Sequence, residues 1–164
     1  MFIVPPELEA RYGEMIAKQT AHILPHWVLE HVHVEILTLE PGEATFRLHG
    51  EEKLFRRFPP PHDVRHLSGQ AVMALADTLL IFPVLASVGH AREMATLNMS
   101  TEFLRPIHDG DITIRAYVLK TGRTAIRGRV DIYDAAGKLS ASSTVCYVYV
   151  NPQAPTSTPT GDAS

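Results

Sequence analysis

The stretch LSGQAVMALADTLLIFPVLASVG, residues 67–89, decides the fold of this chain. Apolar and small residues fill nearly all of it, and Asp77 is its one charged residue. A helix of this composition has no polar face to turn towards water, so the stretch predicts a buried central helix. Pro83 should kink or end that helix, because proline has no backbone N–H and its ring clashes with the preceding turn.

Asp77 lies in the middle of this helix, where an ionised carboxylate is costly to bury without a partner. The neighbours one turn away on either side are small or apolar: Met73, Ala74, Leu80 and Ile81. The partner must therefore come from another element. Two interpretations are open for Asp77: a catalytic carboxylate, or a buried carboxylate that stabilises a dimer without chemistry.

The start of the helix offers a complementary feature. Ser68 is a favourable N-cap residue, and the backbone N–H groups of Gly69 and Gln70 then have no acceptor within the helix. They lie at the positive end of the helix dipole, which favours a developing negative charge. With Asp77, they supply the carboxylate and the oxyanion donor that addition of water to an acyl group requires.

The spacing of these groups limits how they work together. Gly69 and Asp77 are eight residues apart in the sequence, which is roughly 12 Å along one helix. A scissile carbonyl must lie about 3 Å from its oxyanion donor and within reach of the base. We therefore expect Gly69 of one subunit to face Asp77 of another, in a homodimer or a dimer of dimers.

Composition limits the class of protein. The chain has 164 residues, of which 45% are hydrophobic and 20% charged, which suits one soluble globular domain. Its net charge is −3, and no basic stripe stands out, so nucleic acid is not expected as a partner. Its one cysteine, Cys146, excludes an internal disulfide and fits a cytoplasmic location. The apolar start is too short for a signal peptide. Asp77 and Pro83 argue against a membrane span, so we expect no membrane partner.

Hydrophobic periodicity predicts an α+β fold of an N-terminal helix, two strands, the central helix and four strands. The expected domains are an N-terminal helical segment at 1–30, a sheet-and-helix domain at 31–150 and a disordered tail at 151–164. Strands are expected at 31–40, 43–50, 94–104, 111–120, 124–134 and 139–150. Alternation places Leu97, Met99 and Phe103 on one face of their strand and Thr96 on the other. Gly128 indicates a bulge or a close approach.

Three segments in this order resemble the hotdog-fold acyl-CoA thioesterases, in the branch typified by the phenylacetate-pathway (PaaI-like) thioesterase. They are SGQAVMALADT, TLNMSTEFLRP and LKTGRTAIRGRVDIYDAAGKLSASSTVCY, and the resemblance covers roughly residues 32–150. It implies a hotdog fold, an antiparallel six-stranded sheet wrapped around the long helix. Ser68 and Gln70 stand where the family motif has a histidine and a second glycine.

The resemblance implies hydrolysis of acyl-CoA thioesters to a free acid and coenzyme A. Gly69 then polarises the carbonyl, Asp77 acts as general base or nucleophile, Thr96 orients the attacking water, and His62 lies near a loop position that contacts the substrate in some members. Coenzyme A enters as part of the substrate, and no other cofactor is expected. The residues expected to bind substrate are Ser68, Gln70, Met73, Leu80 and Ile81, with Arg65 and Arg123 near the phosphates.

Other interpretations stay open. A hotdog dehydratase or hydratase would need a histidine paired with the carboxylate, for which His62 or His66 could serve. A non-catalytic acyl-CoA-binding protein would explain the substituted motif positions. His31 and His33 share one face of their predicted strand, but no acidic or cysteine ligand is near them in the sequence, so no metal site is expected.

Overall fold

The computed structural model describes residues 2–22, 24–50, 52–61, 64–89 and 93–150. The predicted tail at 151–164 lies outside the described residues. The helices are α1 (Pro6–His22), α2 (His26–His31), α3 (Gly69–Leu79), α4 (Ile81–Val88) and the 3-10 turn η1 (Glu52–Leu54). The strands are β1 (Phe2–Ile3), β2 (His33–Glu40), β3 (Glu43–His49), β4 (Phe55–Arg57), β5 (Arg65–Leu67), β6 (Met94–Phe103), β7 (Ile112–Thr121), β8 (Ala125–Tyr133) and β9 (Leu139–Tyr149).

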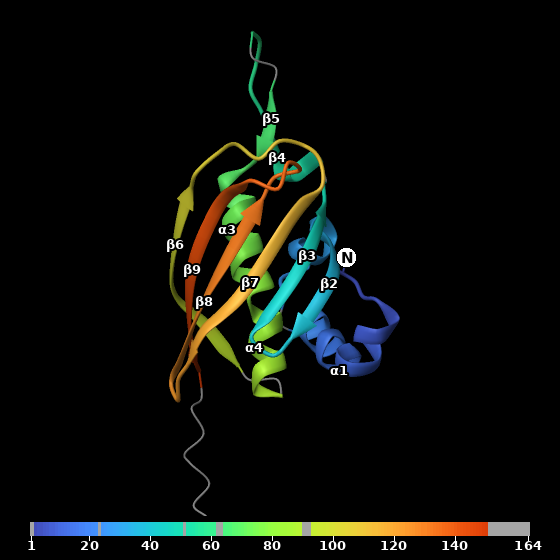
Figure 1. Cartoon of the computed structure of the whole chain (residues 1–164), viewed down its shortest axis with the longest axis vertical. Coiled ribbons are helices and arrows are strands. Elements are labelled where there is room, and N and C mark those ends of the chain that lie inside the picture. Colours follow the sequence, from blue (N-terminus) through green and yellow to red (C-terminus); the bar gives the residue numbers. More distant parts are fainter. Residues whose placement is uncertain (1, 23, 51, 62–63, 90–92, 151–164) are drawn as a thin grey trace, which may run out of the picture.

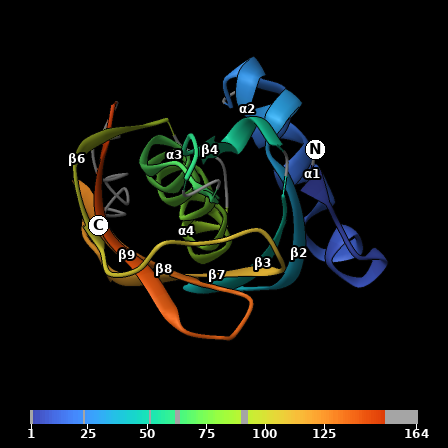
Figure 2. The same cartoon turned by 90° about the horizontal axis from the view of Figure 1, so that it is seen from above.

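One sheet curls around α3 and α4, which confirms the predicted hotdog arrangement. Its order is β1-β2-β3-β7-β8-β9-β6, and the six long strands pair antiparallel as expected. Viewed from above, the sheet forms a trough that covers the helices on three sides and leaves the fourth open (Figure 2). The strands β4 and β5 form a separate two-stranded sheet beyond one end of the trough (Figure 1).

The predicted apolar rows form the core between sheet and helix. The inward-facing side chains of β2, β3, β7 and β8 are almost fully buried, as their period-two pattern indicates: Val34, Ile36, Ala44, Phe46, Leu48, Ile112, Ile114, Ala116, Ile126, Val130 and Ile132. Gly128 lies in the same row, where an added Cβ would be 2.4 Å from a methyl carbon of Leu80 and 2.8 Å from the carbonyl oxygen of Tyr117. The glycine therefore allows the central helix to approach the sheet closely.

The central helix is interrupted at Leu80, between α3 and α4. Pro83 explains the break, because it cannot donate to the carbonyl of Leu79 and its ring crowds that carbonyl. By length and composition, Gly69–Val88 could cross a membrane, but 61% of its most apolar window is buried within the protein. A buried core helix passes the same test of hydropathy, and the sheet around it accounts for its composition.

Three expectations about local structure were wrong. His31 ends the short helix α2, and the strand begins at His33. The sheet has seven strands and not the expected six, because the strand β1 pairs parallel with β2 at the edge. A strand of two residues is too short to show a pattern in the sequence. The central helix is not covered on every side, because Gln70 is exposed and Met73 is 39% exposed. The trough leaves this face to solvent in the single chain.

Candidate active site

Asp77 finds its partner on strand β6. The hydroxyl of Thr96 donates a hydrogen bond to Asp77 Oδ1 over 2.7 Å. Asp77 is half-buried rather than buried, because its side chain lies at the open side of the trough. The predicted pairing of Asp77 with a group from another element is confirmed, and that group is one of the residues expected at the site.

A bulge in β6 turns Thr96 towards the helix. Thr96 pairs with Tyr147 and Asn98 with Cys146, so Leu97 is the extra residue. Because the bulge shifts the alternation by one residue, Thr96 and Met99 lie on the same face of the sheet. Leu97 is 60% exposed. The sequence prediction that Thr96 and Met99 face opposite ways is therefore wrong, since alternation alone does not reveal a bulge.

Tyr147 is a residue of this site that the sequence analysis did not identify. Its phenol donates a short hydrogen bond to the backbone carbonyl of Asp77. Burial, and then the charge of Asp77, raise the pKa of Tyr147 well above its ordinary value, so the phenol stays protonated and remains a donor. Its signal in the sequence was a polar-tipped aromatic residue in the inward row of the last strand, next to the apolar Val145.

The first turn of α3 is capped as predicted. Ser68 is the N-cap residue, and its hydroxyl accepts from the N–H of Ala71 over 3.2 Å. Within the described residues, the N–H groups of Gly69 and Gln70 have no acceptor. These two donors are therefore free to meet an oxyanion at the positive end of the helix.

The predicted oxyanion donor at Gly69 and the carboxylate of Asp77 both lie along the open face of α3. Gly69, Met73 and Asp77 follow one another at intervals of four residues, so they form one stripe along the helix. The helix is unbroken from Gly69 to Leu79, so Gly69 and Asp77 are about 12 Å apart along its axis. One copy of the chain does not bring the two groups to the same carbonyl.

Two hollows flank the first turn of α3. One, of about 320 Å³, lies beside Gly69 and is lined by the loop after β6; its walls include His66, Phe103 and Arg105. The other, of about 200 Å³, lies beside Gln70 and is lined by Ser68, Gln70, Ala71, Trp27, His31, Lys53 and Leu54. Both hollows are mainly apolar with a few polar groups, which is typical of sites for small organic groups.

The remaining predicted residues are dispersed. Leu80 is fully buried against Gly128, away from the open face, whereas Ile81 is half-buried. Arg65 makes ion pairs with Asp109 at 3.1 Å and Glu52 at 3.8 Å, which occupy its guanidinium. Arg123 is exposed in the turn between β7 and β8. His62 lies outside the described residues.

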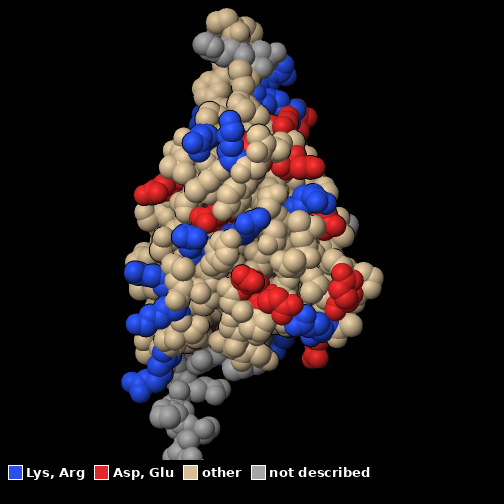
Figure 3. Space-filling model, in the orientation of Figure 1, with Lys and Arg blue, Asp and Glu red and all other residues tan. Residues whose placement is uncertain are grey.

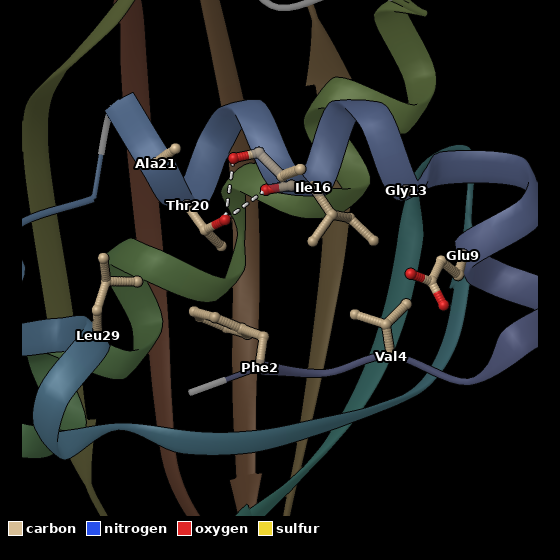
Figure 4. Close-up of a pocket in the computed structure, with 9 residues that line it drawn as sticks. Phe2, Val4, Glu9, Gly13, Ile16, Thr20, Ala21 and Leu29 are labelled. Atoms are coloured by element: carbon tan, nitrogen blue, oxygen red, sulfur yellow. Dashed lines mark hydrogen bonds between the residues drawn. The ribbon is translucent and has the colours of Figure 1, made fainter.

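A further hollow lies on the outer layer, between α1, α2 and the N-terminal strand (Figure 4). Its volume is about 450 Å³, and Phe2, Val4, Ile16 and Leu29 are among the side chains around it. Thr20 turns its hydroxyl back to the carbonyl groups of its own helix. The hollow contains one acid, Glu9, and no base. Nothing in its lining supports chemistry, and Asp77 lies elsewhere.

Among the residues whose positions are described, no three histidine, cysteine, aspartate or glutamate side chains are placed to hold an ion. His31 and His33 lie on different elements, α2 and β2.

The thioesterase superfamily model matches residues 65–141 of this chain, the part that contains α3 with Asp77 and β6 with Thr96. A protein of Saccharolobus solfataricus whose name assigns it provisionally to the esterases is 28% identical over 71% of this chain and 78% of its own length. Both matches are to proteins described as thioesterases or esterases.

Solved structures show the same fold. Thioesterase superfamily member 2 of zebrafish superimposes with a TM-score of 0.65 and 24% identity, over 84% of this chain and 94% of that one. A hypothetical thioesterase of Streptococcus pneumoniae TIGR4, solved with coenzyme A, has a TM-score of 0.63 and 18% identity, over 74% of this chain and 88% of that one. The chain therefore has the hotdog fold that these two proteins share.

Proposed function

We propose that this protein hydrolyses acyl-CoA thioesters to a free acid and coenzyme A, in a site that two copies of the chain build together. The thioester carbonyl rests on the N–H of Gly69, and Asp77 of the other copy either deprotonates the attacking water or attacks the carbonyl itself. Thr96 holds the carboxylate in place. The acyl group is aryl or medium aliphatic, in keeping with the phenylacetate-pathway branch that the sequence resembles.

The observation that carries this proposal is the Asp77–Thr96 hydrogen bond on the open face of α3. A carboxylate whose task is only structural gains most from full burial with all its acceptor sites occupied. Asp77 is instead half-buried, and the hydroxyl of Thr96 is bound to one of its oxygens, Oδ1. Its other oxygen can therefore take a proton from water.

The edge of the sheet supports a site shared between copies. Strand β6 is the last strand of the sheet, and an unpaired edge is a template for a second strand. Leu97 and Phe103 on this strand are 60% and 57% exposed, and Met73 beside it on α3 is 39% exposed. A second copy that covers this edge and the open face of α3 would bring its own Gly69 towards Asp77.

Hydrolysis fits the site better than dehydration. A dehydratase needs a histidine paired with the carboxylate as acid and base. Within the described residues, the side-chain partner of Asp77 is the hydroxyl of Thr96, and no histidine contacts it. The N-terminal donors of α3 suit an oxyanion formed when water adds to a carbonyl.

Release of free thiol from a panel of acyl-CoAs tests the proposal, with wild type compared with Asp77→Asn. The amide keeps the acceptor for Thr96, so the fold should persist while the rate falls by roughly 10²–10⁴ if the carboxylate is a general base. Asp111→Asn is the control, because Asp111 is exposed and lies outside the site. Full turnover in Asp77→Asn would rule out this mechanism, and acyl-CoA binding without turnover in wild type would indicate a non-catalytic binding protein.

A further inference from the structure

The hollow of about 200 Å³ beside the first turn of α3 is built partly from the N-terminal helices. Its walls come from three segments: Trp27 and His31 of α2, Lys53 and Leu54 of η1, and Ser68, Gln70 and Ala71 of the helix start. Figure 2 shows α2 and β6 on opposite sides of α3. The hollow therefore lies away from the sheet edge that a second copy would cover.

Backbone contacts and core packing fix these walls. The N–H of Ser68 donates to the carbonyl of Leu54 over 2.9 Å, which ties η1 to the start of α3. Val28 is 1% exposed and anchors α2 in the core, whereas Trp27 beside it is 47% exposed. Lys53 is therefore one residue away from a fixed contact, and Trp27 is next to a buried side chain.

Positive charge collects at this hollow. Lys53 supplies an ammonium group, the start of α3 supplies the positive end of the helix dipole, and no aspartate or glutamate is among the lining residues. His31 faces Glu30 at 3.8 Å. Within the described part of the chain, neither the ammonium group of Lys53 nor the side-chain amide of Gln70 has an ion-pair or hydrogen-bond partner. The hollow therefore favours an anion that accepts hydrogen bonds.

Several other cations of the protein are neutralised by carboxylates. On the outer face of the sheet, where basic and acidic side chains both occur (Figure 3), Arg47 pairs with Glu35 at 3.0 Å and Arg129 with Asp131 at 3.1 Å. Lys53 is exposed and lines the hollow. Its charge is therefore available to a ligand that enters there.

The remaining walls are apolar and limit what fits. Leu54 and Ala71 are buried, and Trp27 presents its indole ring. An apolar cavity of about 150 Å³ holds one benzene molecule, so a hollow of about 200 Å³ accepts a short chain and its end group but not a long fatty chain. Methylene groups against these walls, followed by an oxygen anion near Lys53, match both kinds of lining.

The hollow begins where the thioester carbonyl would bind. The N–H groups of Gly69 and Gln70 belong to the same first turn of α3 as the wall residue Ala71, and one turn of helix rises about 5.4 Å. A short acyl group whose carbonyl rests on these N–H groups therefore reaches the hollow with its far end.

We propose that this hollow binds the far end of the acyl group and selects a chain that ends in a carboxylate, with Lys53 and Gln70 as donors to that carboxylate. The substrate is then the coenzyme A monothioester of a short dicarboxylic acid. This inference rests on the proposed function and narrows the aliphatic alternative given there. Trp27 sets the limit of chain length, because its indole forms one wall.

Thiol release from adipoyl-CoA and hexanoyl-CoA tests the selection, since the two chains have the same number of carbon atoms and differ in the terminal carboxylate. Wild type should have the higher kcat/KM for adipoyl-CoA. Lys53→Met should lower the ratio of the two kcat/KM values about tenfold, because one charge-assisted contact is lost, whereas Lys53→Arg keeps the charge and should retain most of the ratio. Lys138→Gln, in the exposed turn between β8 and β9, is the control and should keep the wild-type ratio. Wild type without a preference for adipoyl-CoA, or Lys53→Met with the wild-type ratio, overturns the inference.

Trp27→Ala tests the position of the acyl end. Removal of this wall should raise kcat/KM for sebacoyl-CoA, a longer dicarboxylic homologue, relative to adipoyl-CoA. Because Trp27 is largely exposed, the variant should keep the circular dichroism of wild type. A folded variant with an unchanged preference for chain length would overturn the placement of the acyl end in this hollow.

Calorimetric titration of Asp77→Asn with the two six-carbon acyl-CoAs separates this inference from the proposed function. If wild type hydrolyses no acyl-CoA, the proposed function fails, but tighter binding of adipoyl-CoA that is lost when Lys53→Met is added would still support the carboxylate site. Turnover of both substrates with equal binding of the two would refute the carboxylate site and retain the proposed function.

Discussion

A mixture of two inactive variants should recover activity if Gly69 and Asp77 act from different copies. Gly69→Pro removes the proposed oxyanion donor and little else. Gly69 is the first residue of α3, where proline is favoured, and Ser68 before it has φ −68° and ψ 148°, which proline accepts in a preceding residue. An added Cβ would meet Phe103 at an ordinary 3.5 Å. Loss of one such donor should cost roughly 10²–10³ in kcat.

Asp77→Asn is the second variant. The fraction of activity that the mixture recovers depends on which chains supply the two groups of each site. If the two variants are refolded together in equal amounts, half of the dimers combine one chain of each kind. Each mixed dimer has one site with both defects and one intact site, so about a quarter of wild-type activity should return in a two-fold symmetric dimer. If both groups act within one chain, every site keeps one defect and nothing returns.

The assay is thiol release from the best acyl-CoA of the panel, measured on each variant alone, on the refolded mixture and on a mixture combined without refolding. Gly69→Ala is the matched control, because it adds the same Cβ but keeps the N–H, and it should retain most activity. Activity of the refolded mixture no greater than that of the two parents would refute the shared site. Recovery would also show that the chain assembles with the open face of α3 at the interface.

Three further results follow from the packing. Tyr147→Phe removes the donor to the carbonyl of Asp77 and should lower the free energy of unfolding by about 1 kcal/mol. Because the pKa of Tyr147 is raised in the folded state, wild-type stability should fall as pH rises above the ordinary tyrosine value of about 10, and urea unfolding at two pH values should show a weaker fall for the phenylalanine variant. Gly128→Ala should destabilise by about 1–3 kcal/mol through overpacking against Leu80, with partial rescue by a smaller residue at Leu80; thermal unfolding unaffected by the alanine would contradict the close approach. Ser68→Ala should cost about 1 kcal/mol by loss of the helix cap, and Ser68→Asn should restore it in the same denaturant titration.

The elements of the hotdog fold could be predicted because local patterns determine them. The apolar stretch at 67–89 specified a core helix, and period-two rows such as Ile112, Ile114 and Ala116 specified strands buried on one face. Pro83 specified the interruption of the helix. The donors at the helix start could also be predicted from neighbouring residues, because Ser68 caps the helix and the next two N–H groups then have no acceptor within it.

Tertiary structure decided what local patterns do not contain. The bulge at Leu97 reverses the side on which Thr96 lies, and its presence depends on how β6 pairs with β9. Tyr147 meets Asp77 although 70 residues separate them, because both face the same trough. Trp27, Lys53 and Gln70 line one hollow although they come from three separate segments of the chain.

The sequence by itself determined which segments are helix or strand, which side chains form the core, and that Asp77 needs a partner from outside its own helix, because these follow from neighbouring residues and their periodicity. The tertiary structure alone decided that the partner is Thr96, that Asp77 is half-open to solvent, and that one face of α3 and the edge of β6 are left uncovered. Those outcomes depend on strand pairing and on how far the sheet curls, which are set by contacts between residues distant in the chain.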